Sequence, residues 1–67
     1  MILKVMETTD GKYIGLEFDT DWIQEIGGED ILMGTDGVPF KITKTIDVGG
    51  GYWQYSNSHY VIVTKEV

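Results

Sequence analysis

The chain has no cysteine and no arginine, and it contains only one proline and one histidine. Without cysteine it can form neither a disulfide scaffold nor a thiolate nucleophile, and it lacks the main ligands of structural zinc and iron–sulfur sites. Because small secreted domains usually depend on disulfides, we expect a cytoplasmic protein. The first residues contain no long hydrophobic run, so we expect neither a signal peptide nor a membrane span.

The length of 67 residues predicts one small β domain over residues 1–67, without separate substrate and cofactor lobes. A chain of this size buries only about 60% of its unfolded surface, so its stability is marginal and a partner or second copy would help to hold the fold. Hydrophobic residues make up 42% of the chain and charged residues 24%, which is typical of a soluble globular domain rather than a disordered one.

Acidic residues dominate the charge, with eleven carboxylates against five lysines and a net charge of −6. Seven of the acids, and no base, fall within residues 17–36: Glu17, Asp19, Asp21, Glu25, Glu29, Asp30 and Asp36. Phosphate contact depends on clustered Lys and Arg, so we expect no direct nucleic-acid binding and no anionic membrane partner. Solubility is served equally well by mixed signs, so the unmixed span favours a positively charged partner surface.

Glycines separate alternating β-branched and aromatic runs, a pattern typical of a small all-β domain. A two-residue turn at Asp10-Gly11 predicts the first hairpin, because both central positions of such a turn need a positive φ. Its register places four pairs opposite one another: Leu3 with Phe18, Val5 with Leu16, Glu7 with Ile14, and Lys4 with Glu17.

Two further hairpins follow from the same reasoning. A turn at Asp36-Gly37 predicts three pairs: Met33 with Phe40, Ile31 with Ile42, and Glu29 with Lys44. A turn at Asn57-Ser58 places Tyr55 opposite Tyr60 and Trp53 opposite Ile62, and a three-residue loop over 56–58 is the alternative. The run 60–63 is apolar on both faces, which predicts a strand in the middle of the sheet.

Residues 20–26 predict the single helical turn, with Thr20 as its cap and Gly27 or Gly28 at its end. The expected fold is all-β, either a small SH3-like barrel or a curled antiparallel sheet of five to six strands built from three hairpins. Short glycine-punctuated strands, an acidic connecting segment and exposed aromatics resemble an SH3-like small barrel in outline. The Ala-Leu-Tyr-Asp-Tyr type of signature of peptide-binding SH3 domains is absent, so the resemblance concerns architecture alone.

No residue set predicts catalysis. His59 with Ser56 and Ser58 is the one combination that resembles nucleophilic catalysis, which requires a base within reach of the serine and an acid that orients the base. All three lie at a predicted hairpin tip, where an exposed turn histidine is the simpler interpretation. The run of glycines at 49–51 matches no phosphate-binding motif. We therefore expect no enzyme activity and no cofactor.

The carboxylates of Asp19 and Asp21 suggest a calcium-binding loop. The EF-hand pattern, however, requires an oxygen ligand at the fifth position of the loop and a glycine at the sixth. Counted from Asp19, those positions are Ile23 and Gln24, so the pattern fails and we expect no metal. A cation site of another type is the alternative to a solvated acidic segment at a helix start.

The combined pattern predicts a non-catalytic protein-binding module, or a small inhibitor, that docks a positively charged partner. Carboxylates would steer the encounter, and aromatic side chains would anchor it. The predicted contact residues are Glu17, Asp19, Asp21, Trp22, Glu25, Asp30, Tyr52, Trp53 and Tyr55. One alternative is a nucleic-acid mimic that inhibits a DNA- or RNA-handling protein, by analogy with small phage proteins. Another is a structural subunit, a homo-oligomer that assembles through a sheet edge.

Overall fold

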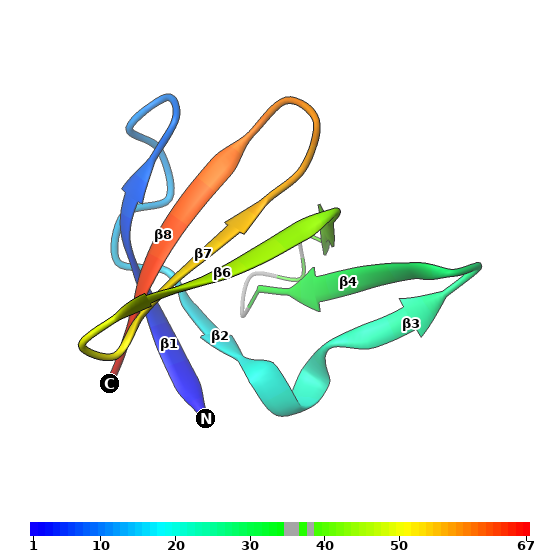
Figure 1. Ribbon diagram of the computed structural model, residues 1–67, viewed down its shortest axis with the longest axis horizontal. Helices are drawn as coiled ribbons and strands as arrows, with labels where there is room; N and C mark the ends of the chain where they lie inside the picture. The colour runs from blue at the N-terminus through cyan, green and yellow to red at the C-terminus, as the bar shows by residue number, and fades with distance from the viewer. Residues whose placement is uncertain (35–36, 38) are drawn as a thin grey trace.

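Two antiparallel sheets make up the fold in the computed structural model, which describes residues 1–34, 37 and 39–67 (Figure 1). The elements are β1 (Ile2–Thr8), β2 (Glu17–Asp19), the 3-10 turn η1 (Thr20–Trp22), β3 (Gln24–Ile26), β4 (Glu29–Met33), β5 (Pro39–Ile42), β6 (Lys44–Gly49), β7 (Tyr52–Ser56) and β8 (Val61–Glu66). One sheet has the order β2-β1-β8-β7-β6 and the other the order β3-β4-β5. The all-β prediction with one short helical turn is confirmed.

The sheets do not close into a barrel, and the described residues form eight strands rather than five or six. One extra strand is β3, which forms where a helical turn was expected. The other arises because the strand expected after Gly37, which included Phe40, Ile42 and Lys44, divides at Thr43. Its first half, β5, pairs with β4, whereas its second half, β6, pairs with β7 in the other sheet. The β3–β4 hairpin therefore projects away from the five-stranded sheet (Figure 1).

The first predicted register is confirmed where β1 meets β2. Leu3 lies opposite Phe18, and Lys4 lies opposite Glu17. The ladder ends at Val5, whose N–H donates to the Leu16 carbonyl at 2.8 Å. The predicted pair of Glu7 with Ile14 is wrong, because the chain turns before β2, where the Leu16 N–H donates to the Tyr13 carbonyl at 3.1 Å, and β2 begins only at Glu17. Residues 9–16 therefore form a wide loop between β1 and β2, in place of the predicted two-residue turn with paired residues on both sides.

The predicted register of β4 against β5 is wrong by one residue. Leu32, rather than Met33, lies opposite Phe40, and Asp30 rather than Ile31 lies opposite Ile42. This register puts Leu32, which is fully buried, on the core side. Asp36, on which the predicted turn depended, lies outside the described residues.

The lysine partner predicted for Glu29 also differs. The Glu29 carboxylate lies 3.2 Å from the Lys41 Nζ, not beside Lys44. Lys44 begins β6, opposite Ser56, because the chain changes sheets just before it.

Both predicted versions of the last hairpin are wrong, although β8 does lie in the middle of its sheet, between β1 and β7. Tyr55 pairs with Ile62, so the turn is centred on Ser58 and His59. The Asn57 side chain selects this turn, because its Oδ1 accepts hydrogen bonds from the backbone N–H groups of His59 and Tyr60 at 2.9 and 2.8 Å.

The predicted helical segment is shorter than expected, and Asp19 rather than Thr20 caps it. The Asp19 carboxylate accepts a hydrogen bond from the Asp21 N–H at 3.0 Å. The chain then extends into β3 instead of continuing as a helix. Gly27 and Gly28, expected to end a helix, form the two-residue β3–β4 turn with φ of +61° and +82°, angles that favour glycine.

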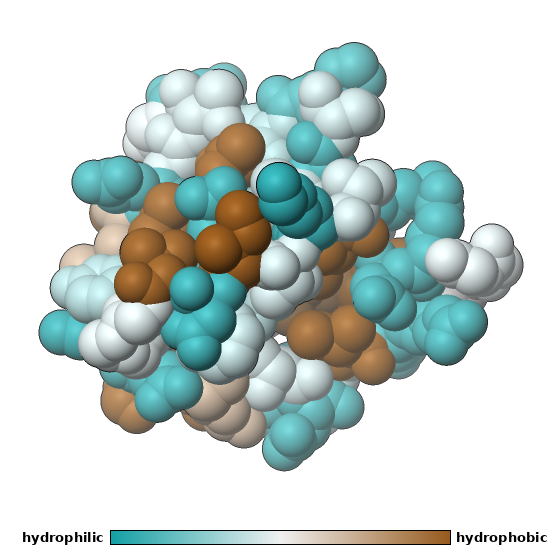
Figure 2. Space-filling model, viewed as in Figure 1, coloured by the Kyte–Doolittle hydropathy of each residue, from teal (hydrophilic) through white to brown (hydrophobic). Residues whose placement is uncertain are grey.

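A small core lies between the two sheets. Its buried hydrophobic residues are Leu3, Val5, Phe18, Leu32, Ile42, Tyr55 and Ile62. The buried Thr64 hydroxyl is satisfied because it donates to the Trp53 carbonyl at 3.1 Å. Apolar surface also gathers outside the core, over β7 and β8, and in the hollow beside the β3–β4 hairpin, which is itself mostly hydrophilic (Figure 2).

Charge reversal tests these registers. Glu25 lies opposite Asp30, and like charges directly opposite each other destabilise a sheet. Glu25→Lys should therefore raise the free energy of unfolding, measured by urea denaturation at low ionic strength, by about 0.5 kcal/mol. Glu17→Lys is the matched control: it turns the pair with Lys4 into a like pair and should lower the free energy of unfolding by a similar amount.

High salt should remove both effects, because the four side chains are exposed. A loss of stability in both variants would contradict the β3–β4 register.

Candidate functional site: an aromatic pocket

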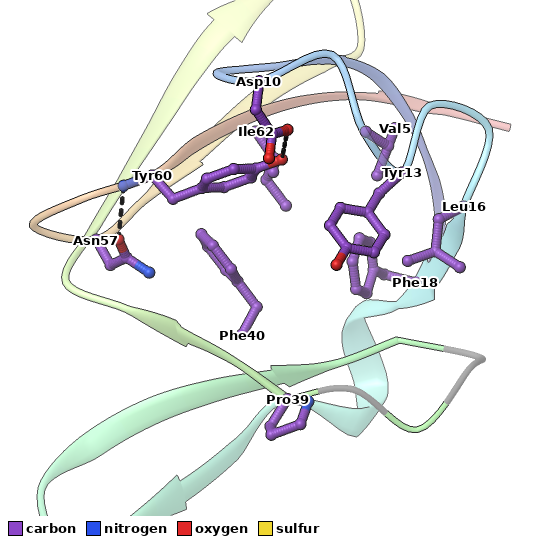
Figure 3. Close-up of a pocket in the computed structure, with 10 residues that line it drawn as sticks. All are labelled: Val5, Asp10, Tyr13, Leu16, Phe18, Pro39, Phe40, Asn57, Tyr60 and Ile62. Carbon is purple, nitrogen blue, oxygen red and sulfur yellow. Dashed lines mark hydrogen bonds between the residues drawn. The ribbon is translucent and has the colours of Figure 1, made fainter.

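A pocket of about 320 Å³ opens where the loop 9–16, the start of β5 and the β7–β8 turn meet. Its lining consists of Val5, Asp10, Tyr13, Leu16, Phe18, Pro39, Phe40, Asn57, Tyr60 and Ile62 (Figure 3). Three of these, Val5, Phe18 and Ile62, belong to the buried core, so the pocket is a direct extension of the core to the surface. Its volume and its mostly apolar lining with a few polar groups are typical of ligand sites.

Aromatic rings face one another across the hollow. Tyr60 and Phe40 lie on one side, and Tyr13 and Phe18 on the other (Figure 3). The Tyr60 and Phe40 rings pack edge to face, with their centroids 6.0 Å apart and their planes at 67°. Edge-to-face packing is a favourable arrangement, and it fixes this wall of the pocket.

A hydrogen bond joins the loop 9–16 to the end of the β7–β8 turn: the Tyr60 hydroxyl donates to the Asp10 carboxylate. The same oxygen, Oδ1, also accepts from the Lys12 N–H at 2.9 Å. The Thr8 hydroxyl lies 3.3 Å from this oxygen and donates to the Lys12 carbonyl at 2.6 Å. The bond from Tyr60 and then the bond from Lys12 hold the pKa of Asp10 below its usual value. Desolvation and the bond to Asp10 raise the pKa of Tyr60. At neutral pH the site therefore holds a carboxylate and a neutral phenol.

The opposite wall depends on an unusual backbone conformation. Tyr13 has a φ of +66°, in the left-handed region, and it is the one non-glycine residue there in the described part of the chain. Left-handed backbone is costly for a bulky side chain, and such strain concentrates at functional sites. The Tyr13 side chain is 54% exposed, so burial does not explain the conformation. In this conformation the Tyr13 ring lies at the pocket (Figure 3).

The loop that carries Tyr13 is also bound to the neighbouring strand. The Thr9 N–H donates to the Val61 carbonyl at 3.1 Å, and the Val61 N–H donates to the Thr9 hydroxyl at 2.8 Å. These two hydrogen bonds, together with the bond between Tyr60 and Asp10, therefore hold the two aromatic walls at a defined separation.

The predicted acidic contact residues lie outside this pocket and do not form one cluster. Glu17 lies opposite Lys4 on β1. Asp19 and Asp21 each have a carboxylate oxygen 3.7 Å from the amino group of Met1. Glu25 and Asp30 do lie together, as neighbours on the β3–β4 hairpin.

The predicted aromatic contact residues are also separated. Tyr55 is only 4% exposed, so it is a core residue and offers no contact surface. Trp53 is half-buried, and its indole N–H donates to a Glu66 carboxylate oxygen at 3.3 Å. Tyr52 lies on the opposite face of β7, with the Lys65 ammonium 5.3 Å from its ring centroid. Trp22, on η1, is 59% exposed.

Sequence reasoning missed the residues that form the pocket walls. The sequence pattern predicts Asp10 as a turn residue, and Phe40 and Tyr60 as members of cross-strand pairs. One local signal was present: Tyr13 lies in a glycine-flanked segment, 11–15, where no strand alternation accounts for an aromatic ring. The contact between Asp10 and Tyr60 spans 50 residues and leaves no local signal.

No protein-family model, curated protein or solved structure matches the chain. Among the described residues, no group of three or more His, Asp or Glu side chains could hold a metal ion. In the same part of the chain, no helix has the length and apolar character needed to cross a membrane. Function therefore has to be inferred from the pocket and from the charge around it.

Removing the Tyr60 hydroxyl tests the central contact of the pocket. Tyr60→Phe should raise the pKa of Asp10 toward its usual value of 3.8, followed by NMR titration of the carboxyl carbon. A lowered carboxyl pKa stabilises the fold above the unfolded-state pKa, and this contribution is lost as pH falls through the folded-state value. The variant should therefore lose less stability than the parent protein on acidification below about pH 4.

Tyr13→Phe is the control, because the Tyr13 hydroxyl makes no hydrogen bond to Asp10. It should leave the pKa of Asp10 unchanged. An unchanged pKa in Tyr60→Phe would show that the hydroxyl does not engage the carboxylate in solution.

Proposed function

We propose that this chain is a non-catalytic protein-binding module that captures a cationic side chain of a basic partner in the aromatic pocket. The observation that carries the proposal is the convergence of aromatic rings and an ionised Asp10 on one hollow. A cation over an aromatic face is attracted by the ring quadrupole, and the attraction strengthens as water is excluded. A nearby carboxylate adds direct charge complementarity.

The distribution of charge over the molecule supports a cationic occupant. Lys4 and Lys65 lie opposite each other on the face of the five-stranded sheet that points away from the core. The pocket opens on the other side, where core side chains form its rear wall. With a net charge of −6, the molecule as a whole attracts cations and speeds their encounter. Lys12 opposes this attraction locally, because it lies close enough to affect Asp10.

A binding role fits the chemistry of Asp10 better than a catalytic one. A general base works best when its pKa is close to the pH at which the enzyme operates. The hydrogen bonds to Asp10 shift its pKa in the opposite direction, further below neutrality. Such a carboxylate is suited to hold a constant negative charge, which is what recognition of a cation requires.

The two alternative functions have less support. Nucleic-acid mimicry needs an array of spaced, uncompensated carboxylates, but Glu17 faces Lys4, and Asp19 lies close to the Met1 amino group. Assembly through a sheet edge would use β2, β3, β5 or β6, and each of these edge strands carries at least one charged residue. The edge strand β6 also has a bulge near its end. Charges and bulges on an edge strand oppose pairing with another chain.

NMR titration with a short lysine peptide tests the proposal, with a norleucine peptide of the same sequence as the uncharged control. The lysine peptide should perturb the amide signals of residues 10–16, Phe40 and Tyr60, and the norleucine peptide should bind at least about fivefold more weakly, since about 1 kcal/mol comes from the charge. Asp10→Asn should weaken lysine binding, whereas Lys12→Gln should strengthen it because it removes the opposing charge.

Equal binding of both peptides would show an apolar site without cation recognition. Perturbation centred on Glu25 and Asp30 would instead assign the contact to the acidic hairpin.

A further inference from the structure

Two side-chain acceptors of the pocket, Asp10 Oδ1 and Asn57 Oδ1, are already used by the protein itself, which leaves Asp10 Oδ2 as the open carboxylate oxygen among the described residues. Asp10 Oδ1 accepts from two donors, the Tyr60 hydroxyl and the Lys12 N–H, while the nearby Thr8 hydroxyl donates to the Lys12 carbonyl at 2.6 Å. Asn57 Oδ1 accepts from two backbone N–H groups in the β7–β8 turn. Six of the ten lining residues have wholly apolar side chains: Val5, Leu16, Phe18, Pro39, Phe40 and Ile62. An occupant therefore meets mainly carbon surface beside a negative charge.

This lining discriminates between kinds of cation. A primary ammonium carries three N–H donors and is strongly hydrated, so it loses favourable water contacts when it enters a site with few open acceptors. Methylation keeps the positive charge but replaces those donors with methyl groups. Methyl groups need no acceptors and pack directly against ring faces, which is how aromatic cages bind quaternary ammonium groups.

We infer that the preferred occupant is a methylated lysine side chain of a partner protein, with trimethyllysine bound more tightly than lysine. This inference rests on the proposed function and specifies its ligand. The walls suit such a group, because Tyr13 on one side and Tyr60 with Phe40 on the other present carbon surface across the hollow (Figure 3).

The charge of the molecule favours a protein source over a choline lipid. Both ligands carry a trimethylammonium group, but phosphocholine also carries a phosphate. A protein with a net charge of −6 repels that phosphate, whereas it attracts the basic residues that flank a lysine in a basic partner.

Three peptides that differ only at the end of one side chain test the inference. They carry lysine, trimethyllysine, and the neutral analogue with a tert-butyl group in place of trimethylammonium, and their affinities are measured by calorimetry. Trimethyllysine should bind about tenfold more tightly than lysine, and the tert-butyl analogue, with the same shape and no charge, should bind more weakly than trimethyllysine by a similar factor. Phosphocholine should bind more weakly than the trimethyllysine peptide.

The outcomes separate this inference from the proposed function. Equal binding of lysine and trimethyllysine would overturn the methyl preference and leave cation capture intact. Binding by none of the peptides would overturn both. Equal binding of the tert-butyl analogue and trimethyllysine would show that charge is not recognised, and tighter binding of phosphocholine would overturn the protein source.

Tyr13→Asn removes one aromatic wall of the pocket and tests the methyl preference in a variant that should still fold. Asparagine tolerates left-handed backbone better than tyrosine, so the variant should be as stable as the parent protein or more stable, with its free energy of unfolding measured in urea. The tenfold preference for trimethyllysine over lysine should fall to less than about threefold, because one aromatic wall is lost.

Tyr13→Phe should retain the preference, since it keeps the ring. Tyr52→Asn, on the outer face of β7 and away from the pocket, is the matched control and should also retain it. Retention of the full preference in Tyr13→Asn would overturn the aromatic cage.

Discussion

The hydrogen bond from the Tyr60 hydroxyl to the Asp10 carboxylate is the contact on which the site depends. It joins two segments that are 50 residues apart in sequence, the loop after β1 and the turn before β8. A bond to a charged acceptor is stronger than one between neutral groups, so it can hold an exposed loop in one position. It positions the Tyr60 ring against Phe40, and it lowers the pKa of the carboxylate beside the pocket.

The size of the domain explains why such a pocket lies directly on the core. A chain of 67 residues has too little interior to separate a binding site from its hydrophobic centre. Val5 and Ile62 therefore serve both as buried core residues and as the rear wall of the pocket. A ligand that covers this wall would extend the core, and a ligand that binds only the folded state adds its binding free energy to stability. Binding and folding are linked here more closely than in a large protein.

Sequence reasoning succeeded where local pattern and charge agree. The opposite pairs Leu3 with Phe18 and Lys4 with Glu17 were predicted correctly, because apolar alternation and the opposite charges of Lys4 and Glu17 indicate the same register. Sequence reasoning failed where a side-chain hydrogen bond, or a chain that passes from one sheet to the other, determines the position of a turn. The hydrogen bonds that Asn57 Oδ1 accepts from the backbone place the last turn at Ser58 and His59. Rules that predict a turn from two adjacent residues take no account of such bonds. The acidic span was recognised, but the pocket was not, because its walls come from segments that only the tertiary fold brings together.

The most direct measurement of the central claim is the set of intermolecular NOEs between the N-methyl protons of a bound trimethyllysine peptide and the aromatic protons of the protein. The account predicts NOEs from those methyl groups to the rings of Tyr13, Phe40 and Tyr60, which places the cation between both walls. NOEs confined to Trp22 or Tyr52, with none to these three rings, would contradict it.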